Sequence, residues 1–135
     1  MQTARVQWVG KEGFVAFSPS GHMVALDSDR ALNGAPGPME LLLVALGACT
    51  ATDVVVILAK KRQALDSLEV EVSGERAADP PAVWVKLEIV YKLRGNLDEQ
   101  AVKRAIQLSE EKYCSVAAML RKTAPIAFRY EIAAP

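Results

Sequence analysis

The chain has 135 residues, 51% of them hydrophobic, and its 16 basic and 16 acidic side chains give a formal net charge of zero. This length suits one compact domain over residues 1–135. Zero net charge argues against nucleic acid as the main partner, because phosphate binding requires an excess of Lys and Arg. Residues 1–9 lack the layout of a secretory signal, and two cysteines then favour a cytoplasmic protein, where thiols are more often catalytic than structural.

The first third of the chain alternates in the manner of β-structure. Residues 5–9, 14–17 and 22–26 predict three strands, which are separated by short turns rich in Gly, Ser and Pro. A polar loop with Asn, Gly and Pro follows over residues 27–37. After this loop we expect a long helix.

That helix is predicted to begin at Pro38, because proline suits a first helical position, where its missing N–H costs nothing. It should run to about Arg62, since the basic residues 60–62 complement the negative end of the helix dipole. Residues 41–59 approach the roughly 20 residues of a membrane span. Asp53 near the middle costs about 2.5–3.5 kcal/mol in a bilayer, so we expect a helix buried in protein and no membrane partner.

A helix that is apolar on nearly every face must be buried on nearly every side. One subunit of 135 residues with a single sheet can cover only part of such a helix. The helix therefore predicts a homodimer in which the two long helices pack against each other.

The rest of the chain completes an α+β pattern. Asn96 and Glu99 match a capping box and predict a helix start at that point. The order βββ-α-ββ-α-α-β is typical of an α+β fold. The predicted elements after the long helix are two strands, two helices and a final strand, over residues 67–75, 83–93, 96–112, 114–120 and 126–132.

Two cysteine motifs carry a family resemblance. The run Pro38-Met39-Glu40-Leu41-Leu42-Leu43 with Gly47-Ala48-Cys49, and Tyr113-Cys114-Ser115-Val116 downstream, resemble the OsmC/Ohr superfamily of osmotically inducible and organic hydroperoxide resistance proteins. The resemblance spans the whole chain. It implies an OsmC-like fold with a long buried central helix, in an intertwined homodimer with two sites at the subunit interface. It also implies thiol-dependent reduction of organic hydroperoxides, and the activity could extend to hydrogen peroxide.

By this resemblance, Cys49 is the peroxidatic cysteine and Cys114 is the resolving cysteine. A peroxidatic cysteine reacts as a thiolate and becomes a sulfenic acid, which a second thiol converts into a disulfide. An external dithiol reductant would then reset the pair by exchange. This chemistry requires no metal and no organic cofactor.

The resemblance also implies an arginine that stabilises the thiolate, because burial in an apolar helix disfavours ionisation of Cys49. Arg30 is the candidate in the loop before the helix, with Arg5 as a substitute, and Arg30 could instead be a solvated loop charge. Glu40 would hold the arginine in a bidentate pair. Glu40 and Cys49 are nine residues apart, about half a turn around the helix and roughly 13 Å along it. Either the helix bends near Gly47, or Glu40 and its arginine serve the partner's Cys49, which we favour.

Other polar residues receive weaker interpretations. His22, the only histidine, is interpreted as exposed or structurally hydrogen-bonded, and two cysteines with one histidine fall short of the four ligands of a metal site. Asp53 is assigned no catalytic role. Cys114 precedes a predicted helix start, where free N–H groups favour a thiolate, but it could also be a small buried residue.

Two other functions compete with the peroxidase. One is a non-enzymatic OsmC-like stress protein that binds a small apolar or thiol ligand at the dimer interface. The other is a thiol–disulfide oxidoreductase acting on proteins, which the absence of a Cys-x-x-Cys pair disfavours.

Overall fold

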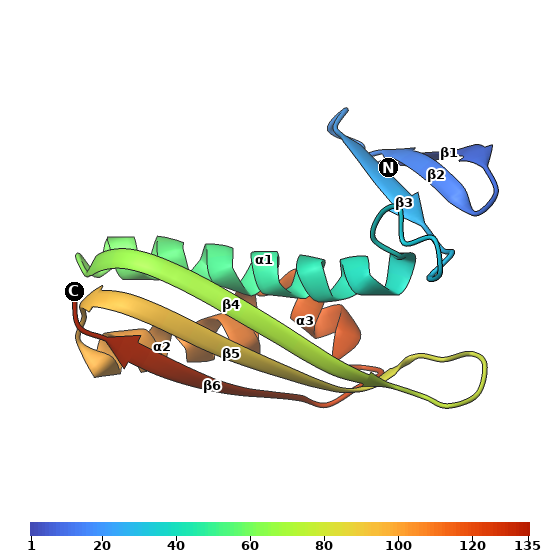
Figure 1. Cartoon of the computed structure of the whole chain (residues 1–135). Helices are drawn as coiled ribbons and strands as arrows, with labels where there is room; N and C mark the ends of the chain where they lie inside the picture. Colours follow the sequence, from blue (N-terminus) through green and yellow to red (C-terminus); the bar gives the residue numbers. More distant parts are fainter. The chain divides into compact units, whose positions relative to one another are not determined.

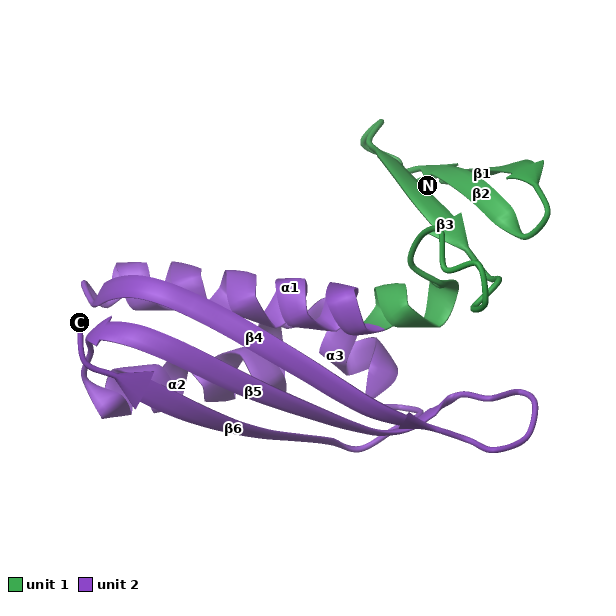
Figure 2. Cartoon of the chain, viewed as in Figure 1, with its two compact units in different colours: residues 1–42 green, residues 43–135 purple.

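The computed structural model describes residues 1–135 as two compact units, residues 1–42 and residues 43–135 (Figure 2). The predicted element order is confirmed, with one additional π-helical turn (η1) between the last two helices (Figure 1). One domain over residues 1–135 stays a prediction. The elements are β1 (Arg5–Gly10), β2 (Gly13–Phe17), β3 (Met23–Asp27), α1 (Pro38–Lys60), β4 (Ala64–Arg76), β5 (Trp84–Asn96), α2 (Glu99–Leu108), η1 (Ser109–Tyr113), α3 (Ser115–Leu120) and β6 (Ile126–Ala133).

The first unit is an antiparallel sheet with the strand order β1-β2-β3. Its buried residues are Asp27 and Gly37, so it contains no apolar core of its own. Large apolar side chains on the strands are exposed instead, namely Val6, Trp8, Val9, Met23 and Val24. These side chains leave a costly apolar surface exposed on the single chain.

The second unit is built on a sheet with the order β4-β5-β6, in which β5 pairs antiparallel with β4 and parallel with β6. Alternate residues of the central strand β5 are buried: Leu87, Ile89, Tyr91 and Leu93. The parallel pair requires a crossover connection, which α2, η1 and α3 provide. One face of the sheet therefore carries the core of the unit.

Helix α1 lies close to β4 at Gly47. A Cβ at this position would be 3.2 Å from Val72 Cγ2, closer than the two groups normally pack. Glycine therefore permits the approach of the helix to the sheet. The buried residues of α1 are Leu46, Gly47, Thr50, Val54 and Leu58.

The rest of α1 is less enclosed. Leu42, Val44, Val55 and Val56 are exposed, and the protein buries 28% of the most apolar stretch of 18 residues in this helix. By length and composition this helix could also cross a membrane. The expectation that one subunit covers only part of the helix is confirmed.

The predicted start of α2 is wrong. Asn96 is the last residue of β5, where it pairs with Ala64. The helix is capped by Asp98, whose carboxylate accepts a hydrogen bond of 3.1 Å from the backbone N–H of Ala101. The strand ladder thus extends through the residue that the capping-box pattern had assigned to the helix.

Candidate functional site

The two cysteines belong to separate elements of the second unit and interact with each other. Cys49 lies on α1 and is half-buried, whereas Cys114 lies immediately before α3 and is buried. Both are free thiols. The Cys49 side chain is among the groups that raise the pKa of Cys114, so the two cysteine side chains are neighbours. This proximity is what a redox pair requires.

Burial raises the pKa of Cys114 to about 12. The backbone N–H of Ala117, which donates to Cys114 Sγ over 3.3 Å, acts in the opposite direction. The hydrogen bond and charge of Cys49, and the charge of Asp53, raise the pKa further. Of the two interpretations of Cys114, the structure favours the small buried residue, because one N–H donor does not offset the effect of burial on its pKa.

Arg30 and Glu40 form the predicted ion pair within the first unit. Arg30 Nη1 donates to Glu40 Oε2 over 3.2 Å, a single hydrogen bond rather than the predicted bidentate pair. The second nitrogen, Nη2, donates instead to the backbone carbonyls of Asp27 and Ala35. Glu40 Oε2 also accepts from the N–H of Gly37 over 2.9 Å, as a third-position helix glutamate does in a capping box. The pair fixes the arginine at the start of α1.

Asp27 organises the loop that carries Arg30, a role that the sequence did not predict. It is buried, and its carboxylate accepts hydrogen bonds from the N–H groups of Asp29 and Gly34, over 2.9 and 3.0 Å. A Cβ on Gly34 would lie 2.9 Å from Asp27 Oδ2, so a glycine is needed there. The Asp-Ser-Asp run is a local signal for such a turn, since Asp side chains bond to the backbone two residues on.

Two other predicted candidates have partners of their own. The Arg5 guanidinium lies 4.8 Å from the centre of the Phe17 ring. His22 is exposed, and its Nδ1 is 3.0 Å from Ser20 Oγ, as its structural interpretation predicts. Which arginine serves Cys49, and in which subunit, stays a prediction.

A buried polar network beside the cysteines was not predicted. Ser109 Oγ donates to Asp53 Oδ2 over 2.8 Å and lies 2.8 Å from Thr50 Oγ1. The Thr50 hydroxyl is hydrogen-bonded to that of Tyr91, which donates to Glu110 Oε1 over 2.6 Å. We call these five residues the Asp53–Glu110 chain. Its members come from α1, β5 and η1, so no local pattern indicates it.

The Asp53–Glu110 chain is bonded to further groups at its Glu110 end and at Ser109. Arg121 donates through Nη2 to the backbone carbonyl of Glu110 over 2.7 Å, and its Nη2 is 3.4 Å from Glu110 Oε2. Burial and the hydrogen bond to Glu110 raise the pKa of Tyr91, which therefore keeps its proton. The N–H of Cys114 donates to the carbonyl of Ser109 over 2.9 Å, so the chain also adjoins the resolving thiol.

The comparison with protein families decides the identity. The OsmC-like protein family matches residues 31–129 of this chain. The chain belongs to the OsmC-like family. The family resemblance and the OsmC-like fold predicted from the sequence are confirmed.

Individual relatives cover almost the full chain. Protein YhfA of Escherichia coli strain K12 is 42% identical over 132 residues, which are 97% of this chain and 98% of YhfA. The crystal structure of a hypothetical protein from Aquifex aeolicus VF5 is 30% identical, with a TM-score of 0.91 over 100% of this chain and 98% of the other. The organic hydroperoxide resistance protein OhrB of Bacillus subtilis is 16% identical, with a TM-score of 0.66 over 96% and 98% of the two chains. The likeness to OhrB shows a shared fold.

A cavity of about 340 Å³ in this OsmC-like protein lies between α1 and the segment from Leu108 to Tyr113. Asp53, one turn after Cys49 on α1, and Tyr113, the neighbour of Cys114, both line it. A second groove, of about 420 Å³, runs between α1 and β4. The residues of the first cavity are Asp53, Val56, Ile57, Lys60, Lys61, Leu108 and Tyr113.

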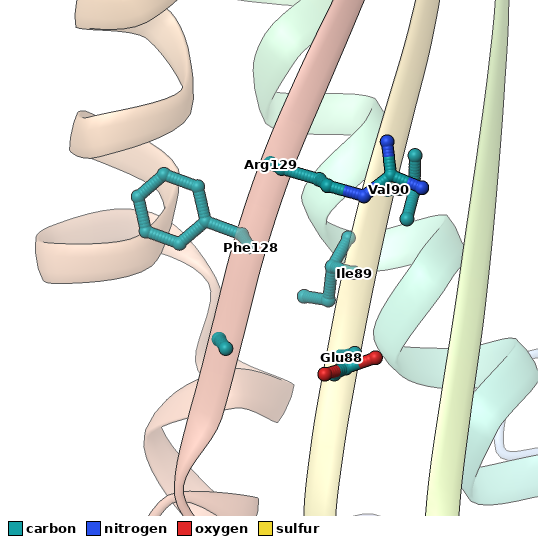
Figure 3. Close-up of a pocket in the computed structure, with 6 residues that line it drawn as sticks. Glu88, Ile89, Val90, Phe128 and Arg129 are labelled. Atoms are coloured by element: carbon teal, nitrogen blue, oxygen red, sulfur yellow. The ribbon is translucent and has the colours of Figure 1, made fainter.

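A smaller hollow on β5 and β6 contains no thiol. Its volume is about 110 Å³, and Figure 3 shows Glu88 and Val90 of β5 with Phe128 and Arg129 of β6 around it. No group of three or more His, Cys, Asp or Glu side chains is placed to hold a metal ion.

Proposed function

We propose that this OsmC-like protein is a thiol-dependent peroxidase that reduces organic hydroperoxides. The observation that carries the proposal is the interaction between two reduced thiols, Cys49 and Cys114, from separate elements. Family membership supports it, as does the fold shared with OhrB, which is named for organic hydroperoxide resistance. Two free thiols also support a cytoplasmic protein.

In the proposed reaction, the Cys49 thiolate attacks the hydroperoxide ROOH and breaks its O–O bond. Cys49 becomes a sulfenic acid, and the alkoxide RO⁻ takes up one proton to leave as the alcohol. Cys114 then attacks the sulfenic sulfur, which forms a disulfide and releases water. An external dithiol reduces this disulfide by exchange and is itself oxidised to a disulfide.

The protonation of Cys114 supports this division of roles. Its pKa of about 12 keeps it protonated at neutral pH. Thiolates rather than thiols attack peroxides. Cys49 is therefore the better candidate for the first attack, and Cys114 needs to react only after the sulfenic acid has formed beside it.

We further propose that the protein is a homodimer and that Arg30 and Glu40 complete the site of the partner's Cys49. The exposed apolar residues of the first unit and of α1 support the dimer, because both surfaces need cover. The Arg30–Glu40 pair supports the second part, since Glu40 holds a guanidinium at the start of α1. Such a guanidinium would stabilise the thiolate and the developing alkoxide.

The first test is a single turnover of the reduced protein with one equivalent of cumene hydroperoxide. We expect each chain to lose two hydrogens in the intact mass and both free thiols. The Cys49→Ser protein should leave the peroxide unconsumed, whereas Cys114→Ser should react once and then over-oxidise when the peroxide is in excess.

Thr52→Ser is the matched control, because the Thr52 hydroxyl bonds only to the carbonyl of Ala48, over 2.8 Å. It should react as the parent protein does. Two free thiols and unconsumed peroxide in the parent would contradict the proposal and favour the ligand-binding alternative.

A further inference from the structure

The Asp53–Glu110 chain has room for one more hydrogen than its hydroxyl groups provide. Four hydrogen bonds join its members in sequence, from Asp53 to Ser109, Ser109 to Thr50, Thr50 to Tyr91 and Tyr91 to Glu110, and a longer one of 3.5 Å joins Thr50 to Glu110. Each of the four sequential bonds uses one hydrogen, but the three hydroxyls supply only three, and an ionised carboxylate supplies none. One additional proton would complete the four sequential bonds, from Asp53 to Glu110. The chain is therefore built to accept a proton.

The Asp53 end of this chain reaches the cysteine pair. Asp53 follows Cys49 by one helical turn, and residues four apart are neighbours on the same face of a helix. The charge of Asp53 also acts on Cys114. Proton transfer requires hydrogen-bond reach, directly or through one water, and Asp53 is the carboxylate on the turn of α1 that follows Cys49.

The Glu110 end lies in an irregular part of the backbone. The N–H of Cys114 donates to the carbonyl of Ser109, five residues earlier, as in a π-helical turn. This turn directs Ser109 and Glu110 into the interior, and both are buried. No buried side-chain nitrogen or oxygen lacks a partner, so the network is closed within the protein. π-helical turns often occur at functional sites.

We propose that the Asp53–Glu110 chain is a proton relay that takes the proton of the Cys49 thiol and returns it to the leaving alkoxide. The inference rests on the proposed peroxidase function. The thiol proton passes to Asp53 and supplies the fourth hydrogen of the chain, which leaves a thiolate on Cys49. After the thiolate has cleaved the O–O bond, the same proton converts RO⁻ into ROH. The chain then holds three hydrogens again.

The proton balance closes over the whole cycle. Condensation of the Cys49 sulfenic acid with the Cys114 thiol forms the disulfide and releases water, with no net proton. Reduction by an external dithiol returns two thiols, and Cys49 is ready to transfer its proton again. In this proposal Asp53, Ser109 and Thr50 accept and return the proton of the Cys49 thiol. They are relay residues and do not attack the peroxide.

The test measures alkylation of Cys49 by iodoacetamide between pH 6 and pH 10, in a Cys114→Ser background that leaves one thiol. Alkylation reports the thiolate and needs no peroxide. The variants are Asp53→Asn, Thr50→Val and Thr50→Ser, with Thr52→Val as the control on the exposed side of α1. The titratable groups that face the relay or line its cavity are Tyr91, Glu110, Tyr113, Arg121, Lys60 and Lys61.

We expect Thr50→Val and Asp53→Asn to lower the alkylation rate at pH 7 by about tenfold or more, and to approach the parent rate at pH 10, where hydroxide replaces the relay. The sign for Asp53→Asn is informative, because removal of a negative charge beside a thiol would by itself favour the thiolate and speed alkylation. Thr50→Ser and Thr52→Val should keep the parent profile.

A Thr50→Val profile that superimposes on that of Thr52→Val, or faster alkylation in Asp53→Asn, would overturn the relay. If Thr50→Val does not fold, Tyr91→Phe interrupts the same chain from β5 and should lower the rate likewise. Alkylation that follows these expectations in a protein that leaves cumene hydroperoxide unconsumed would support proton acceptance by the chain and refute the peroxidase. The two proposals therefore fail separately.

Discussion

The protonation of Cys114 can be tested in isolation by removing the other thiol. In the Cys49→Ser protein, Cys114 is the only thiol that iodoacetamide can alkylate. Burial is the largest cause of the raised pKa of Cys114, and it persists in this variant, whereas the contributions of Cys49 are lost. The thiol should therefore keep a pKa well above its ordinary value of 9.0.

The expected magnitude follows from the shift. The pKa of Cys114 in the parent protein, about 12 against 9.0, lowers the thiolate fraction at pH 8 by about 1,000-fold, since each unit is a factor of ten. The Cys49→Ser protein should show part of this reduction, at least about tenfold relative to the same chain unfolded in urea. Its rate should increase tenfold per pH unit through pH 9, where the unfolded control begins to level off. A folded-state rate that levels off near pH 9 would refute the argument.

The same shift predicts how stability depends on pH. A raised thiol pKa favours the protonated native state, so its contribution is complete below pH 9 and is lost as the pH rises toward 12. Three pKa units correspond to at most about 4 kcal/mol. Above pH 9, the free energy of unfolding measured in urea should fall more steeply with pH for the parent protein than for Cys114→Ser. Parallel dependence on pH in the two proteins would contradict the raised pKa of Cys114.

Two further predictions concern packing and assembly. Gly47→Val should destabilise the protein by about 1–3 kcal/mol in urea unfolding, because its Cβ would be 3.2 Å from Val72, whereas Ala48→Val on the exposed side should cost less. An equal cost for both would show that the approach of α1 to β4 is not tight. Val44→Lys places a charge on the exposed apolar face of α1 and should shift the proposed dimer toward monomer in light scattering, with Lys103→Ala on α2 as the control. An unchanged dimer would exclude that face from the interface.

The success of the sequence predictions depended on how local their signals were. The period-two alternation of residues 67–75 marked β4, and the apolar run after Pro38 marked α1, because each pattern reports a face that its own segment buries. The start of α2 was misplaced by two residues, since Asn96 and Asp98 both suit a cap and only the pairing with Ala64 assigns Asn96 to a strand.

Local sequence patterns predicted only part of the candidate site. Arg30 and Glu40 are close in sequence, and their pairing was predicted correctly except for its single hydrogen bond. The protonated state of Cys114 was not predicted, because burial is a property of the whole packed unit. The N–H of Ala117, which is close to Cys114 in sequence, lowers the pKa of Cys114 by less than burial raises it.

The sequence by itself determined the α+β class, the element order and the OsmC-like identity, because these follow from periodicity and from two cysteine motifs along the chain. Only the tertiary structure brings Cys49 and Cys114 together as neighbours. It also connects Asp53 to Glu110 through three hydroxyl groups. These side chains come from segments far apart in the sequence, and they meet because the sheet, α1 and the π-helical turn pack around one core. Hydrogen bonds between such segments depend on distances in the folded protein, and the spacing of residues along the sequence does not predict those distances.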